Sequence, residues 1–399
     1  MRIKRIGAVV VSLTIALGAS AGAQETLDSS VSHVPGAHDL ARNTADGDFL
    51  VAWAGMNVDQ KLEIRAHRLD PSGDKVGTTI SVDPSSLGAT EVSVAYGEGR
   101  YLVAWRDGRK ASSNGDELYG RIIATDGNPV GGSFRISDIG DKGPDSFPDV
   151  VFDGQKFLVA WAHRHLPPSG GGFTVSFVEN DDIRGRYVTV DGTMDAGSFA
   201  FTEEAVDSQR PSIAVLSGSP LAVWEDHPGP GTPGQVWGAR APQDLEIYSS
   251  FPYAIGSGMA KERPQIVANP DKGQFLVLWR ADTVRSGHLL YARLATTVGK
   301  YIGKVRVVPG VDAGLNTFSA AYDSTRKEYL VSWDMGVQGS AEQIRAVRLN
   351  SSTLDQVTKM QITEGDTKNW GMVSDPAGSG DPLSVYLREI GRASCRERV

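Results

Sequence analysis

The stretch "FLVAW" at residues 49–53 recurs as "YLVAW" at 101–105 and as "FLVAW" at 157–161. Four related pentads follow, in the order "PLAVW", "FLVLW", "YLVSW" and "PLSVY". The terminal aromatic residues are separated by 52, 56, 63, 55, 54 and 53 residues, and they are Trp53, Trp105, Trp161, Trp224, Trp279, Trp333 and Tyr386. A repeat of this length indicates an architecture built from successive copies of one structural unit.

The pentad is apolar at nearly every position and does not alternate between apolar and polar residues. Such a run predicts a strand that is buried on both faces. In "YLVAW", Tyr101, Val103 and Trp105 point to one side, and Leu102 and Ala104 point to the other. We therefore expect the large side chains of one unit to pack against the small side chains of its neighbour.

Each repeat contains three further strand signals around its pentad. In "FPDVVFDGQKFLVAW" (147–161), the dipeptide Asp153-Gly154 separates two apolar runs and is typical of a tight hairpin. After a polar loop come a third run, such as "LYGRIIATDG" (118–127), and a short fourth run, such as "SFRIS" (133–137). Four short strands in roughly 53 residues match a β-propeller blade, whereas a sandwich domain needs about 100 residues.

We predict an all-β protein, a β-propeller of four-stranded antiparallel blades that occupies residues 24–388. Seven blades are expected, with eight as the open alternative. The last unit starts around Asn369 and is truncated, since it lacks its third and fourth strands. The segment "TLDSSV" (26–31) precedes the first unit, and we expect it to complete the last blade and close the ring.

Residues 1–23 have the features of a secretory signal peptide. A short basic stretch and an apolar run lead to the small residues Ala21-Gly22-Ala23, so we expect cleavage after Ala23 and a secreted or periplasmic protein. The apolar run is shorter than the roughly 20 residues of a spanning helix. No other apolar stretch is long enough, so we expect no transmembrane segment.

The final segment, "EIGRASCRERV" (389–399), differs from the rest of the chain and resembles the in-frame translation of a sequencing-library adapter. We treat it as an artefact. It holds the only cysteine, Cys395, so disulfides, thiol catalysis and a zinc–cysteine site are not expected. Leaving out three basic residues of the leader, and three Arg and two Glu of this tail, changes the net charge from −8 to −12. A diffuse acidic surface repels a phosphate backbone, so nucleic acid is not an expected partner.

The repeat resembles the blades of large secreted bacterial propeller proteins, in which an F/Y-L-V-x-W strand precedes an I-x-G-x-R-like strand that ends in Asp-Gly. The resemblance covers residues 24–388 and implies the architecture rather than an activity. The Ser-x-Asp-x-Gly-x-Thr-Trp box of sialidases is absent from the sequence. So are Gly-x-Ser-x-Gly, His-Glu-x-x-His and a phosphate loop.

Candidate ligand-binding residues lie mainly in the variable loops after the second strand of each unit, which we expect to gather on one face. They are Arg106, Asp107, His163, His165, Asp226, His227 and Asp282. Such imidazoles and carboxylates can hold a metal or act as acid and base, but their spacing is not a metal signature, so no cofactor is expected. Calcium bound by Asp138, Asp141 and Asp145 is the alternative.

A recurrent arginine in the third strand of each complete unit suggests a structural role rather than a ring of anion-binding groups. These residues are Arg68, Arg121, Arg186, Arg240, Arg293 and Arg348.

Together these patterns favour an exported, non-enzymatic propeller that binds a glycan or a protein through its loop face. Two alternatives stay open. One is a secreted polysaccharide hydrolase or lyase with acid and base among His163, His165, Asp226 and His227. The other is a structural module of a longer surface protein. The absence of catalytic motifs favours binding over catalysis.

Overall fold

The structure is a computed structural model, and all of its regular elements among the described residues are β-strands. It describes residues 9–17, 24–28, 38–56, 59, 61–112, 115–139, 143–165, 180–202, 207–227, 229, 232–241, 261–283, 287–311, 315–335, 343–361, 369–374, 377–378 and 383–392. In this part of the chain there is no helix long and apolar enough to cross a lipid bilayer.

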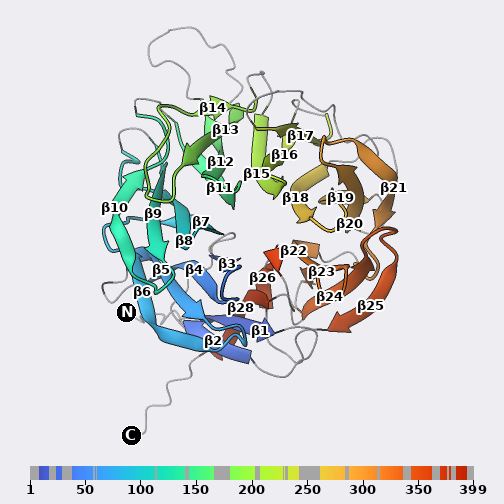
Figure 1. Cartoon of the computed structure of the whole chain (residues 1–399), viewed down its shortest axis with the longest axis horizontal. Helices are drawn as coiled ribbons and strands as arrows, with labels where there is room; N and C mark the ends of the chain where they lie inside the picture. The colour runs from blue at the N-terminus through green and yellow to red at the C-terminus, as the bar shows by residue number, and fades with distance from the viewer. Residues whose placement is uncertain are drawn as a thin grey trace, which may run out of the picture.

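Seven sheets surround a common axis, which confirms the predicted β-propeller with seven blades (Figure 1). Blade 1 contains β3 (His38–Arg42), β4 (Phe49–Met56), β5 (Leu62–Leu69) and β6 (Lys75–Asp83). Blade 2 contains β7 (Thr90–Gly97), β8 (Arg100–Asp107), β9 (Glu117–Ala124) and β10 (Pro129–Arg135). Blade 3 contains β11 (Asp145–Phe152), β12 (Phe157–Arg164), β13 (Asp181–Val188) and β14 (Phe199–Ala200). In these three blades the strands are antiparallel and follow chain order from the axis outward.

The remaining blades repeat this plan. Blade 4 contains β15 (Asp207–Leu216), β16 (Ser219–His227) and β17 (Gln235–Arg240). Blade 5 contains β18 (Lys261–Asn269), β19 (Gln274–Thr283), β20 (Gly287–Thr296) and β21 (Tyr301–Val307). Blade 6 contains β22 (Leu315–Asp323), β23 (Glu328–Met335), β24 (Gln343–Asn350) and β25 (Gln356–Gln361), with β27 (Ala377–Gly378) parallel to β22.

The seventh blade combines the two ends of the described chain. Its strands are ordered β2 (Gln24–Asp28), β1 (Val9–Leu17), β28 (Leu383–Arg392) and β26 (Asn369–Ser374). The segment 26–31, which we expect to complete the last blade, lies in this blade over residues 26–28, where it pairs with β1, and residues 29–31 lie outside those described. Strand β1 occupies the position that the third strand holds in the other blades, and its removal as part of a signal peptide stays a prediction.

The core lies between neighbouring blades, as the pentads predict. Leu102 and Ala104 of blade 2 pack in one cluster with Phe157, Val159 and Trp161 of blade 3. The same arrangement joins blades 1 and 2, where Leu50 and Ala52 meet the large residues of the next pentad. All six pentad tryptophans are at most 1% exposed. Alternation along one strand thus explains how each blade interlocks with two neighbours.

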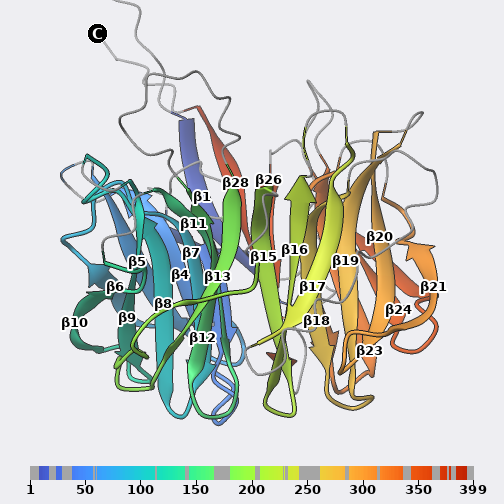
Figure 2. The same cartoon turned by 90° about the horizontal axis from the view of Figure 1, so that it is seen from above.

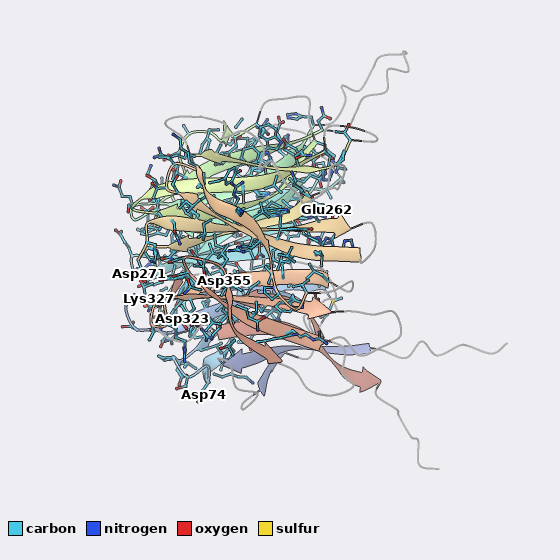
Figure 3. All side chains as sticks on the ribbon, turned by 90° about the vertical axis from the view of Figure 1, so that its right-hand side faces the viewer. Asp74, Glu262, Asp271, Asp323, Lys327 and Asp355 are labelled. Atoms are coloured by element: carbon cyan, nitrogen blue, oxygen red, sulfur yellow. The ribbon has the colours of Figure 1, made fainter. Side chains whose placement is uncertain are left out.

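The strands run roughly parallel to the ring axis, and successive strands alternate in direction (Figure 2). The connections from second to third strand, and from fourth strand to the next blade, therefore leave from one end, which we call the loop face. Figure 3 shows Glu262, at the start of β18, toward that end, and Asp271, Lys327 and Asp323 at the opposite end.

Some of the recurrent third-strand arginines join neighbouring blades. Arg121 Nη1 donates to the carbonyl of Val82 in blade 1 at 2.6 Å, and Arg186 Nη1 donates to that of Ile136 at the end of blade 2 at 2.8 Å. Arg348 is buried and paired with Asp323 within blade 6. These contacts bear out the predicted structural role for these three residues.

A chain of hydrogen bonds connects the innermost strands. Asp39 Oδ2 accepts from Val94 N at 2.8 Å, Ser93 Oγ accepts from Val150 N at 3.1 Å, and Asp149 Oδ2 accepts from Ile213 N at 2.7 Å. In each case the side chain of one blade binds the backbone of the next. Burial raises the pKa of Asp39 to about 7 and that of Asp149 to about 6, although these amide N–H donors oppose the rise.

We expect the substitution Asp149→Asn to remove part of the pH dependence of stability. Because the folded-state pKa of Asp149 is raised, the folded chain keeps a proton that the unfolded chain loses above about pH 4, so this residue lowers stability as pH rises toward about 6. An amide oxygen still accepts from Ile213 N but carries no charge. Urea unfolding of both proteins between pH 4 and 7 should show that the free energy of unfolding of the variant increases relative to that of the parent as the pH rises.

The matched control is Asp74→Asn, an acid-to-amide change at an exposed turn at the opposite end of the ring from the loop face. This control should stay within about 0.5 kcal/mol of the parent throughout the range. A constant difference between Asp149→Asn and the parent at all pH values would contradict the prediction.

Candidate functional site

The innermost strands of blades 2 to 5 each contain a β-bulge near the loop face. The pairing register with the second strand shifts between Thr90 and Ser93 in β7, and at the equivalent place in β11, β15 and β18. The residues at these bulges have φ between 49° and 55°, and they are Glu91, Phe147, Arg210 and Arg263. For a residue with a Cβ atom this conformation costs about 1–2 kcal/mol. Strained positions of this kind gather at functional sites, and bulges are common beside them.

The local sequence explains the bulge in three of the four blades. A proline follows the bulge residue in "FPD" (147–149), "RPS" (210–212) and "RPQ" (263–265). Proline has no N–H to donate to the neighbouring strand, so it fits where the hydrogen-bond ladder is interrupted. The four bulge residues start adjacent strands around the axis. Phe147 N donates to Glu91 Oε2 at 2.8 Å, and the Arg210 guanidinium lies 4.8 Å from the centroid of the Phe147 ring.

Glu225, near the end of β16, connects the bulges of blades 4 and 5. Its side chain is fully buried, and its carboxylate accepts hydrogen bonds from Arg210 Nη1, from Arg263 N and from His227 Nε2. Burial alone would raise the pKa of Glu225. The His227 hydrogen bond, the Arg210 charge and the Arg263 N–H outweigh that effect, so the pKa is lowered.

His227 closes β16 and is partly exposed at the loop face. The hydrogen bond with Glu225 raises the pKa of His227, burial opposes the rise, and the charges on Glu225, Asp207 and Glu262 add to it. The charged form of this imidazole is therefore favoured relative to a histidine in water.

Three guanidinium groups meet in this sector of the loop face. We call Arg210, Arg263 and Arg280 the arginine cluster. Burial lowers the pKa of Arg263, the positive charges of Arg280 and Arg210 lower it further, and the carboxylates of Glu225 and Glu262 only partly offset this. Arg280 of β19 is also paired with Glu262. Arg263 therefore lies within electrostatic range of both other guanidinium groups and of two carboxylates.

Two carboxylates lie beside the arginine cluster, on the side of blade 3. Asp181 N, at the start of β13, donates to Asp207 Oδ1 at 3.2 Å, and Asp181 Oδ1 accepts from Arg164 Nε at 2.8 Å. Burial raises the pKa of Asp181, the charge of Asp207 raises it further, and Arg164 opposes the rise. A carboxyl with a raised pKa next to a second carboxyl is the kind of pair that general acid and base roles use.

The structure places the sequence-predicted site residues in different environments. Asp107 and Asp226 are buried, and each accepts a hydrogen bond at 2.9 Å from the indole Nε1 of the tryptophan two residues earlier. His163 is also buried, with Nδ1 2.8 Å from Asp145 Oδ1. These three side chains therefore stabilise the blades.

The other predicted residues lie at the loop-face ends of their strands. Arg106 pairs with Glu91 at 3.2 Å and with Asp116 at 2.7 Å. His165 is half exposed and lies 2.6 Å from Asp182. The backbone of Asp282 is in register with His288, but its side chain lies outside the described residues. Of the seven, only His227 is part of the sector that contains the arginine cluster.

Sequence reasoning missed the arginine cluster and Glu262. The available signal was the repeated residue–proline pair at the start of the inner strands. These pairs indicate a site only once the pairing of the first and second strands is known, because that pairing places them at bulges in adjacent blades.

The described residues contain no grouping of three or more histidine, cysteine, aspartate or glutamate side chains able to hold a metal ion. Of the alternative calcium ligands, Asp138 accepts a hydrogen bond from Arg186, Asp145 binds His163, and Asp141 lies outside the described residues. The two described carboxylates therefore have protein partners.

No family model matches the sequence, and no curated protein matches it. Solved structures do match the fold. The Hadza microbial sialidase Hz136 aligns with a TM-score of 0.52 at 11% identity, covering 96% of this chain and 89% of Hz136. This similarity shows the fold, that of a β-propeller.

Two further structures align with lower scores. Trypanosoma rangeli sialidase in complex with the inhibitor DANA has a TM-score of 0.46 at 10% identity over 81% of this chain, and the alignment spans only 57% of that sialidase. The GH93 α-L-arabinofuranosidase of Fusarium graminearum has a TM-score of 0.48 at 12% identity, covering 77% of this chain and 96% of that enzyme.

Proposed function

We propose that this protein is exported and binds a glycan at its loop face, through the sector where blades 3, 4 and 5 meet. The observation that supports this most is the convergence on Glu225 of Arg210 and Arg263, at adjacent bulges, and of His227, at the end of β16. Hydrogen-bonding groups held on rigid strands provide the fixed geometry that saccharide recognition requires. Hz136, which shares the fold, is named a sialidase, so a glycan is the ligand class to test first.

The test is a glycan array probed with the purified chain and with the double variant Arg210→Gln/Arg280→Gln. The parent should be retained on a defined subset of glycans, and the double variant should lose most of that signal. The control is Lys327→Gln, an exposed change at the opposite end of the ring, which should bind like the parent. Failure of the parent to bind any glycan, or unchanged binding by the double variant, would refute the proposal.

Glycan hydrolysis is the second candidate function, and the pair Asp181 and Asp207 favours it. The raised pKa of Asp181 suits a general acid, and the neighbouring Asp207 suits a base, as a pair of carboxylates does in glycoside cleavage. Under this candidate, Asp181→Asn and Asp207→Asn should each reduce hydrolysis of an array-selected glycan by at least about 100-fold. Intact glycan after long incubation with the parent would leave binding as the function.

A further inference from the structure

We propose that Asp39, Ser93 and Asp149 share one proton across three blades, and that this proton makes them a pH-sensitive switch of the loop face. We call the three side chains the acid–serine bridge. This inference goes beyond the proposed function, and only its consequence for ligand binding rests on that function.

The bridge joins the innermost strands of blades 1, 2 and 3, which are β3, β7 and β11 and lie side by side around the axis (Figure 1). The buried Ser93 Oγ lies 3.1 Å from Asp39 Oδ2 and 3.5 Å from Asp149 Oδ1. Val150 N donates to the same Oγ at 3.1 Å. One hydroxyl thus stands between two carboxyl groups.

The number of hydrogen atoms decides how many links this hydroxyl can make. A serine hydroxyl has one hydrogen to donate and two lone pairs that accept. When both carboxyls are ionised, the Ser93 hydrogen can reach only one of them. When one carboxyl keeps its proton, its O–H donates to Ser93 Oγ while the hydroxyl donates to the other carboxylate, and Val150 N fills the remaining lone pair. The geometry therefore favours one retained proton for the pair.

The environment of the two carboxyls acts in the same direction. Burial raises the pKa of Asp39 to about 7, and the charge of Asp149 adds to the rise. Burial likewise raises the pKa of Asp149 to about 6, although Ser93, Ser212 and backbone N–H donors oppose it. The proton should therefore leave between about pH 6 and 7, as a property of the pair. The other charged residues of the inner strands on either side of β11, which are β7 and β15, are Glu91, Asp207 and Arg210.

The bridge is connected to the bulges at the loop face. Ser93 and Asp149 each follow a bulge residue by two positions, Glu91 and Phe147 respectively. Phe147 N donates to Glu91 Oε2, and the Phe147 ring lies under the Arg210 guanidinium, so Phe147 contacts the bulges of both neighbouring blades. When the proton leaves to solvent, one link at Ser93 is lost and the two carboxylates repel. Strand β11 then shifts relative to β3 and β7, and Phe147 moves with it.

The first test follows the switch without any ligand. The chain is labelled with nitrogen-15 at phenylalanine and isoleucine, and the amide resonances of Phe147 and Ile213 are recorded by TROSY NMR between pH 5 and 8. Ile213 N reports the ionisation of Asp149, because it donates to Asp149 Oδ2 at 2.7 Å, and Phe147 N reports the loop face. Both resonances should move with a common midpoint between about pH 6 and 7. A stationary Ile213 resonance in this range, or a moving Ile213 with a stationary Phe147, would overturn the inference.

Three isosteric variants assign the midpoint to the bridge. Asp149→Asn imitates the protonated acid, since its amide keeps an acceptor for Ile213 N and a donor group toward Ser93, so most of the movement of both resonances should disappear. Asp39→Asn should lower the midpoint by at least about one pH unit, because Asp149 no longer faces a second carboxylate. The control, Asp74→Asn at the opposite end of the ring, should titrate like the parent. Circular dichroism melting verifies that each variant folds, and an unchanged midpoint in Asp39→Asn would rule out a shared proton.

The ligand-binding consequence is measured with an array-selected glycan. Between pH 5.5 and 8, the affinity of the parent should fall by at least about threefold more than that of Asp149→Asn, because only the parent loses the bridging proton. Both proteins contain His227, so its titration contributes equally to each. An equal pH response in the two proteins would overturn the control of binding by the bridge. An array with no binder would refute the proposed function, and the NMR titration would still decide between a shared proton and none.

Discussion

Replacing Trp161 with alanine is expected to lower the free energy of unfolding by about 3–5 kcal/mol. The side chain is only 1% exposed and packs between blades 2 and 3 against Leu102 and Ala104. Its indole Nε1 also donates to Asp145 at 3.0 Å. The substitution therefore opens a cavity at a blade interface and leaves a buried carboxylate short of one donor.

Urea unfolding followed by tryptophan fluorescence measures this loss. Trp161→Phe should have an intermediate effect, because it keeps most of the apolar volume and removes only the indole donor. Ile139→Ala, at a side chain that is 91% exposed, should change stability by less than about 0.5 kcal/mol. A loss below about 1.5 kcal/mol for Trp161→Ala would mean that the interface repacks and that the pentads are not the main source of stability.

Glu225→Gln should cost about 3–5 kcal/mol near neutral pH, the range found when one partner of a buried ion pair is removed. The carboxylate is fully buried and accepts from Arg210, from His227 and from Arg263 N. An amide offers one acceptor oxygen and no charge, so the side chains of Arg210 and His227 lose their charged partner. The arginine cluster would then lose the group that offsets part of its repulsion.

The pH dependence of this loss has a definite sign. Because the folded-state pKa of Glu225 is lowered, its stabilisation is complete above its ordinary value of 4.5 and is lost as pH falls through the lower, folded-state pKa. Urea unfolding of parent and variant should therefore converge as the pH drops below about 4.5. Asp271→Asn, in an exposed ion pair with Lys327, should cost less than about 1 kcal/mol. A difference between parent and Glu225→Gln that is unchanged at acidic pH would contradict the assignment of this charge.

The fold could be predicted from the sequence because its determinant is local. The alternation of Tyr101, Leu102, Val103, Ala104 and Trp105 fixes which face each side chain occupies, and the repeat length fixes the unit that carries it. The interlocking of large and small faces between blades follows directly and is what the structure shows.

The candidate site could be predicted only in part, because it depends on how several blades meet. Arg106 and His227 do lie at the loop face. Asp107 and Asp226 also follow a pentad tryptophan, but the indole N–H of that tryptophan donates a hydrogen bond to each carboxylate. The proline after Arg263 was its only local sign, since the role of Arg263 depends on a bulge register and on Glu225 of the neighbouring blade.

At the repeated bulge the backbone has the same conformation in four blades, whereas the side chain differs from blade to blade. Four successive blades present one residue each at the same backbone position, and those residues are an acid, an aromatic ring and two bases: Glu91, Phe147, Arg210 and Arg263. The main chain there is fixed by the strands and by the prolines that follow in three of the blades. Under the proposed function, substitution at these four positions would change the groups that face the ligand while the strands and their register stay the same.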